Sequence, residues 1–134
     1  MTTHPFLEAH LSLVPPGRRP IVRLLLVNRS TTEIAELLRY NLPFEGQLDN
    51  DVFVVCNASG GTLEWLGRYV KRPTPTERDY FFIGPGESAE WEVDLSPYYE
   101  GAASEVTYAA YHEALSEPRP LYHLRSNTLS LTRP

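Results

Sequence analysis

The sequence repeatedly alternates apolar and polar residues with a period of two, and this feature constrains the fold more than any other. Residues 6–13 (FLEAHLSL) alternate in this way, and residues 21–27 (IVRLLLV) form a second apolar run after the loop PPGRRP. Successive side chains of a β-strand point to opposite faces, so this period predicts strands that are half-buried on a core. Further short candidate strands follow at close spacing: residues 36–41, 51–56, 62–66, 68–71, 80–83, 88–95, 105–111 and 121–131.

Turn-forming residues separate these candidate strands. Residues 57–61 (NASGG) are typical of a hairpin loop. In the run Gly84, Pro85, Gly86, the proline presets φ and the second glycine supplies the positive φ of a type II turn. The 12 prolines and 8 glycines are more than the helices of a bundle accommodate. About seven to nine short strands in one small domain therefore predict an all-β fold, namely an immunoglobulin-like antiparallel β-sandwich without the Cys–Trp–Cys core of antibody domains.

Length and charge are those of an ordinary globular domain. The 134 residues fit one domain, which we expect to span residues 1–134. The net charge is −5 and basic residues are scattered, so no basic stripe favours nucleic acid. No apolar run approaches the roughly 20 residues of a membrane span, and the first residues lack a signal-peptide pattern. We therefore expect no membrane association, and a cytoplasmic location as encoded, or a secreted or periplasmic one if a leader has been removed.

One near-match to a catalytic motif stands out. Residues 112–116 read HEALS, so a second histidine at position 116 would complete the zinc-peptidase signature H-E-x-x-H. That signature needs both histidines on one face of a helix, whereas Pro118 opposes helix continuation and the alternation upstream predicts a strand. On a strand, His112 and Glu113 point to opposite faces. We interpret the near-match as chance.

The sequence also lacks the patterns typical of other catalytic or metal-binding sites. Cys56 is the single cysteine, which excludes an internal disulfide, and its apolar context predicts a buried small hydrophobe. A calcium loop that begins at Asp49 would need glycine at position 54, where the chain has Val54. Ser59 lies in no G-x-S-x-G elbow. We therefore expect no enzymatic activity, no catalytic residues, no metal site and no cofactor.

An ordered series of short motifs lies between residues 22 and 111. They are Val27-Asn28-Arg29-Ser30, Leu38, Pro43-Phe44-Glu45-Gly46, Asp51-Val52-Phe53-Val54, Trp65-Leu66-Gly67, Lys71-Arg72 with Pro75, Asp79-Tyr80, Pro85-Gly86-Glu87-Ser88, Val93-Asp94-Leu95-Ser96 and Tyr99. In this order and spacing, the region resembles the non-catalytic N-terminal or propeptide β-sandwich domain of deuterolysin-like zinc metallopeptidases, including the bacterial peptidyl-Lys type. Residues 114–134 have no counterpart in the resemblance, and we predict that they form an extra C-terminal strand segment.

The resemblance implies that such a domain inhibits its own peptidase, or assists its folding, in cis. For this chain we therefore expect a protein-binding domain that does the same to a deuterolysin-like metallopeptidase in trans. The candidate binding residues are Lys71, Arg72, Pro73, Thr74 and Pro75, where two prolines stiffen a basic loop tip and lower the entropy lost on docking. Lys71 is the only lysine in the chain. A peptidase that selects lysine could bind it as a substrate-like anchor.

A plainer interpretation of the same loop also stands. Lys71 and Arg72 could end a strand and pair with Glu77 or Asp79 across the turn, as a surface ion pair of small energetic value.

An alternative function is a structural or adhesive immunoglobulin-like module that binds another protein or a glycan through its loops. Its candidate contact residues are the aromatic side chains Trp65, Tyr69, Tyr98, Tyr99 and Tyr122.

The oligomeric state stays open between a monomer and an edge-strand dimer, because residues 121–131 could pair within the chain or with a second copy. Prolines and arginines near both ends are interpreted as edge protection: Pro5, Pro15, Pro16, Arg18, Arg19, Pro20, Arg133 and Pro134.

Overall fold

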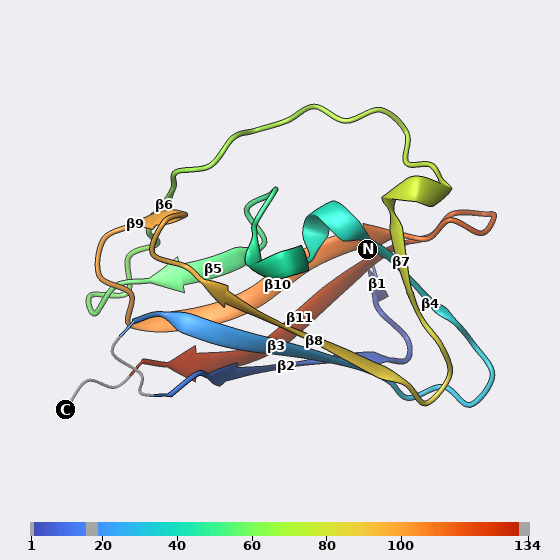
Figure 1. The fold of residues 1–134 in the computed structure, drawn as a ribbon, viewed down its shortest axis with the longest axis horizontal. Coiled ribbons are helices and arrows are strands. Elements are labelled where there is room, and N and C mark those ends of the chain that lie inside the picture. The colour runs from blue at the N-terminus through green and yellow to red at the C-terminus, as the bar shows by residue number, and fades with distance from the viewer. Residues whose placement is uncertain (1, 16–18, 132–134) are drawn as a thin grey trace.

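Short strands make up nearly all of the regular structure (Figure 1). This computed structural model describes residues 2–15 and 19–131. The strands are β1 (Thr2–Thr3), β2 (Leu7–Leu13), β3 (Ile21–Asn28), β4 (Ala35–Leu38), β5 (Phe53–Cys56), β6 (Glu64–Trp65), β7 (Tyr80–Ile83), β8 (Ser88–Asp94), β9 (Tyr99–Glu100), β10 (Glu105–Glu113) and β11 (Leu121–Ser130). The 3₁₀ helices are η1 (Arg39–Asn41), η2 (Phe44–Gly46) and η3 (Glu77–Asp79). The predicted all-β class is confirmed, whereas the immunoglobulin-like arrangement stays a prediction.

One curled mixed sheet forms the body of the molecule, in the order β5-β10-β11-β2-β3-β8, with β1 beside β11. Its neighbours are antiparallel, except that β1 and β2 both run parallel to β11. Two small sheets, β4-β7 and β6-β9, complete the fold. Buried side chains from both ends of the large sheet join one apolar core, which includes Val55 of β5, Leu24 of β3 and Val93 of β8. In the described part of the chain, no helix is long and apolar enough to cross a membrane.

A side-chain amide joins the two halves of the large sheet. Between β2 and β11 the register contains one backbone pair, Ala9 with Ser126. One residue further along, the Asn127 amide accepts the Leu11 N–H at 2.7 Å and donates to the Leu11 carbonyl at 3.0 Å. Asn127 thereby satisfies both backbone groups of Leu11, as a paired strand residue would. The open question about residues 121–131 is answered, because this strand pairs within the chain.

Several local predictions are confirmed. β2 alternates between buried and exposed side chains, with Leu7 and Leu11 in the core. The strand predicted at residues 88–95 is present as edge strand β8, where Glu92 on the solvent face pairs with Arg23 of β3. The predicted type II turn is present, since Gly86 has φ of 71° and the Glu87 N–H donates to the Gly84 carbonyl at 3.0 Å.

Three predictions need correction. Residues 68–71 form no strand, although their composition favours one, because no neighbouring strand pairs with them. The strand predicted at residues 36–41 ends at Leu38 and continues as η1. Cys56 is half-buried, not fully buried, because it lies at the end of edge strand β5.

The predicted edge protection is also mostly wrong. The outermost strands of the large sheet are β5 and β8, whereas Pro5, Pro15 and Pro20 flank the interior strands β2 and β3. Arg19 does contact an edge strand, through an ion pair with Asp94 of β8. Four residues of the prediction lie outside the described residues: Pro16, Arg18, Arg133 and Pro134.

Candidate functional site

His112, from the near-match to H-E-x-x-H, belongs to a buried hydrogen-bond network on β10. Its Nδ1 accepts the Leu38 N–H at 2.9 Å, so Nε2 carries the proton and donates to the Tyr108 hydroxyl at 2.9 Å. That hydroxyl in turn donates to the Asn41 carbonyl at 2.7 Å. Burial lowers the pKa of His112 to about 3, so the ring is neutral near pH 7. The prediction that His112 and Glu113 point to opposite faces of a strand is confirmed.

The acidic run at residues 49–51 is part of a turn. Asp51 accepts a hydrogen bond from the buried Tyr99 hydroxyl at 2.6 Å, and Asn50 donates to the Asn41 side chain at 2.7 Å. Burial and the bond to Asp51 raise the pKa of Tyr99. Within residues 2–15 and 19–131, no three His, Cys, Asp or Glu side chains lie close enough together to hold a metal ion.

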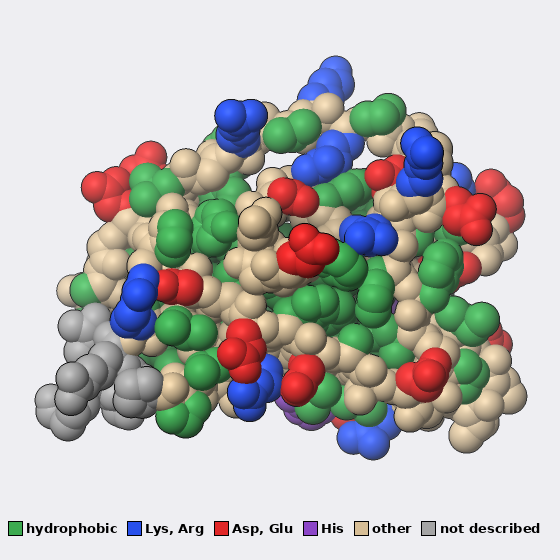
Figure 2. Space-filling model, viewed as in Figure 1, with side chains coloured by type: hydrophobic (Ala, Val, Ile, Leu, Met, Phe, Trp, Pro, Cys, Tyr) green, Lys and Arg blue, Asp and Glu red, His purple; other side chains and the backbone are tan. Residues whose placement is uncertain are grey.

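The predicted binding residues lie on one long loop, residues 66–76, which we call the arch loop. It leaves the sheet after β6, arches over the molecule without regular structure and returns at η3 (Figure 1). Figure 2 shows Lys and Arg side chains gathered along this part of the surface. Lys71, Arg72, Pro73 and Thr74 are exposed, and Pro75 is half-buried. The structure therefore brings the five predicted residues together on one accessible segment.

Two exposed apolar side chains lie next to the predicted residues, and only Tyr69 was among the candidate contact residues of the alternative function. Tyr69 is 84% exposed and Val70 is 49% exposed, directly before Lys71. The sequence signal was present in the aromatic and β-branched types, but it was interpreted as a strand. Large exposed apolar side chains that adjoin one another indicate an interaction surface more often than isolated ones do.

The first end of the arch loop is fixed by the aromatic pair that precedes it. The Trp65 ring stacks on Tyr98 with centroids 5.8 Å apart, and its Nε1 donates to the Arg68 carbonyl at 3.3 Å. The Leu66 N–H donates to the Tyr98 carbonyl at 2.8 Å. Gly67 is required here, because a Cβ at this position would overlap the Trp65 ring.

Contacts also fix the far end and the middle of the arch loop. Arg119 donates from Nη2 to the Pro75 carbonyl at 2.8 Å, and Thr76 forms a capping box with Asp79 at the start of η3. The guanidinium of Arg72 lies 4.2 Å from the centroid of the Tyr40 ring, within cation–π range. Segment 69–71 is therefore presented between anchored flanks.

The ion pair predicted for this loop is not formed. Among the described residues, neither Lys71 nor Arg72 pairs with Glu77 or Asp79. Arg72 instead lies over Tyr40 at the side of a hollow of about 290 Å³, which mixes acidic and basic residues. Lys71 remains an exposed charge on the tip.

The aromatic residues of the alternative function divide into two groups. Trp65 and Tyr99 are buried in the core, and Tyr98 packs against Trp65. Tyr69 is exposed but belongs to the arch loop. Tyr122 is half-buried and lines a separate hollow, described next.

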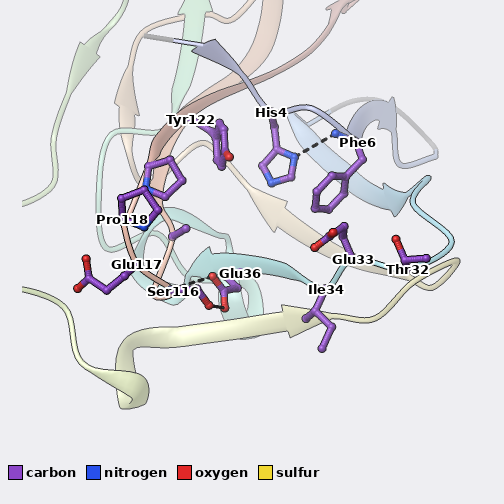
Figure 3. Close-up of a pocket in the computed structure, with 12 residues that line it drawn as sticks. His4, Phe6, Thr32, Glu33, Ile34, Glu36, Ser116, Glu117, Pro118 and Tyr122 are labelled. Carbon is purple, nitrogen blue, oxygen red and sulfur yellow. Dashed lines mark hydrogen bonds between the residues drawn. The ribbon is translucent and has the colours of Figure 1, made fainter.

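A second hollow, of about 410 Å³, opens between the N-terminal segment and the loop that joins β10 to β11. We call it the His4 pocket. Figure 3 shows the residues that line it: His4, Phe6, Thr32, Glu33, Ile34, Glu36, Ala114, Ser116, Glu117, Pro118, Pro120 and Tyr122. No sequence pattern predicted this pocket, because its walls come from three segments that are distant along the chain: residues 4–6, 32–36 and 114–122.

Comparison with known proteins gives one informative similarity. The chain matches no known protein-family model. It is 30% identical over 98 residues to an extracellular protease of Aeromonas hydrophila, and the match covers 72% of this chain and 27% of that protein. The chain thus spans about a quarter of the length of this relative. The similarity indicates a protease-related domain, and the closer likeness to deuterolysin-like peptidases stays a prediction.

Proposed function

We propose that this chain is a non-enzymatic protein-binding domain that docks on a zinc metallopeptidase of the deuterolysin-like, peptidyl-Lys type and inhibits it in trans. The observation that carries the proposal is the arch loop, which holds the only lysine on an exposed and anchored segment. The similarity to part of an extracellular protease supports the same partner class.

The loop has the physical properties of an inhibitory segment. Its two ends are already fixed by the Trp65–Tyr98 stack and by Arg119, so little further backbone entropy is lost when a partner binds. Tyr69 supplies a large aromatic contact of the kind that dominates interface energies. Lys71 supplies a single charged anchor for a lysine-selecting pocket, and Pro73 and Pro75 restrict the backbone that follows.

Inhibition kinetics test the proposal. The purified chain is titrated into a peptidyl-Lys metallopeptidase that cleaves a small peptide substrate, and the inhibition constant is measured. We expect inhibition that Lys71→Ala weakens by about tenfold or more, equivalent to about 1.4 kcal/mol, because the anchor is lost. Arg125→Ala is the matched control, since Arg125 is an exposed basic residue on β11 away from the loop, and it leaves the constant unchanged.

Two results would count against the proposal. Full inhibition by Lys71→Ala would show that the loop is not the anchor, and absence of both inhibition and binding would overturn the peptidase as a partner. An increase in the yield of refolded peptidase, without inhibition of the folded enzyme, would replace the inhibitor by a folding chaperone.

A second candidate function, an adhesive module that binds another protein, is favoured by one observation. The His4 pocket is formed without any residue of the arch loop.

A further inference from the structure

His4 directs an unused hydrogen-bond donor into the His4 pocket. The residue is only 7% exposed, and its Nδ1 accepts the Leu7 N–H at 3.1 Å and the Phe6 N–H at 3.4 Å. Because Nδ1 accepts, the proton of the neutral ring lies on Nε2. No described residue accepts a hydrogen bond from Nε2, which faces the space between Tyr122, Phe6 and Glu36 (Figure 3).

The charge state of His4 follows from its surroundings. Burial lowers its pKa to about 4, so near pH 7 the ring is neutral and offers one N–H to the pocket. Nε2 is not an enclosed atom, since among the described residues the buried side-chain nitrogen or oxygen without a partner is Nε of Arg119. The free donor of His4 therefore reaches the open pocket, where an acceptor oxygen of a ligand can bind it in place of water.

The pocket carries negative charge that no cation in the described chain neutralises. Glu33, Glu36 and Glu117 line it, no lysine or arginine does, and none of the three takes part in an ion pair. Glu36 is held in place, since Ser116 donates to its two carboxylate oxygens from N at 3.1 Å and from Oγ at 2.7 Å.

Rings and aliphatic side chains form the remaining walls. The His4 ring lies between Phe6, at 4.7 Å between centroids, and Tyr122, at 4.9 Å. Pro118 and Pro120 continue this apolar surface. An aliphatic stem that ends in a cation is the side chain that fits such walls and such charge, because the stem packs on rings while the head reaches the carboxylates.

We propose that the His4 pocket binds a lysine or arginine side chain of a partner polypeptide. The ammonium or guanidinium group lies among Glu33, Glu36 and Glu117, and a backbone carbonyl of the partner accepts the His4 Nε2–H. The volume of about 410 Å³ lies within the roughly 300–1,000 Å³ of small-ligand pockets. The proposal does not depend on the inhibitory role of the arch loop.

NMR titration of the whole chain tests this site with two small probes, N-acetyl-lysine methylamide and its uncharged counterpart N-acetyl-norleucine methylamide. We expect the lysine probe to shift the His4 ring signals with a dissociation constant of about a millimolar, since one charged group and one hydrogen bond give only weak affinity. The norleucine probe leaves these signals unshifted at the same concentrations.

Glutamate variants test whether the carboxylates of the pocket bind the cation of the lysine probe. Glu33→Gln together with Glu117→Gln should weaken the lysine probe by about fivefold or more, because each change removes a carboxylate near the cation. Glu64→Gln is the control, an exposed carboxylate on β6 outside the pocket, and has no effect. Both probes shifting the His4 signals equally, no shift with the lysine probe, or a shift with a neutral sugar in its place would each overturn the proposal.

Discussion

His4 and His112 are two buried histidines with similar contacts at Nδ1 but different surroundings at Nε2. Each accepts backbone N–H groups at Nδ1, which fixes the proton on Nε2, and burial lowers the pKa of each. The Nε2–H of His112 donates to the Tyr108 hydroxyl inside the core. The Nε2–H of His4 faces a solvent-open pocket that is lined by carboxylates. The comparison teaches that the second ring nitrogen, and not burial, distinguishes a structural histidine from a candidate binding residue.

The largest expected effect comes from removing the structural histidine. His112→Ala leaves the Leu38 N–H without an acceptor and the Tyr108 hydroxyl without its donor, and it opens a cavity. We expect a loss of about 4 kcal/mol in the free energy of unfolding, measured by urea denaturation. His4→Ala should lose about 1 kcal/mol, because water reaches the groups that it frees. Equal losses would remove the distinction between the two histidines.

The pH dependence of stability is the next largest effect. Both histidines have folded pKa values below the ordinary value of 6.5, so the unfolded chain binds more protons between pH 6.5 and about 4. Stability is therefore full above pH 6.5 and falls as the pH is lowered through this window. Between pH 6 and 5 we expect a loss of about 2 kcal/mol, measured by denaturation at each pH.

A matched pair of variants separates the two contributions to this slope. His4→Gln should keep about half of it, since His112 still titrates only on unfolding. His112→Gln should likewise keep about half of the slope, since His4 still titrates only on unfolding. A slope that is unchanged in His4→Gln would show that His4 is protonated as readily in the folded chain as in the unfolded one.

The smallest expected change in stability comes from altering Tyr108, the hydrogen-bond partner of His112. Tyr108→Phe removes the hydroxyl that accepts from His112 and donates to the Asn41 carbonyl, and we expect a loss of about 1–2 kcal/mol in the free energy of unfolding. Tyr122→Phe is the control in the His4 pocket, and its hydroxyl makes no hydrogen bond to a described residue, so thermal denaturation should show little change. If Tyr108→Phe leaves the free energy of unfolding unchanged, water replaces the hydroxyl in the core.

Strand positions could be predicted from sequence far better than strand partners. Period-two alternation located β2, β3, β8 and β10, because it reports which residues face a core. It says nothing about which strand lies beside which, so the parallel pairing of β2 with β11 had no signal. Residues 68–71 show the same limit, since strand-forming types there find no neighbour.

The two candidate sites were predictable to different degrees. The five residues on the arch loop are contiguous, so prolines beside a basic pair were enough to mark them. The His4 pocket combines an isolated histidine with glutamates far along the chain, and only the folded sheet brings them together. Tyr69 and Val70 were misinterpreted, because their types favour a strand wherever a neighbour exists.

The amide of Asn127 gives the molecule a late step in its assembly. It connects β2 with β11 through two residues that are separated by 116 positions. Such distant pairing costs loop-closure entropy before any contact offsets it, so the chain should fold slowly, and β2 must wait with one side unpaired until residue 127 has emerged from the ribosome.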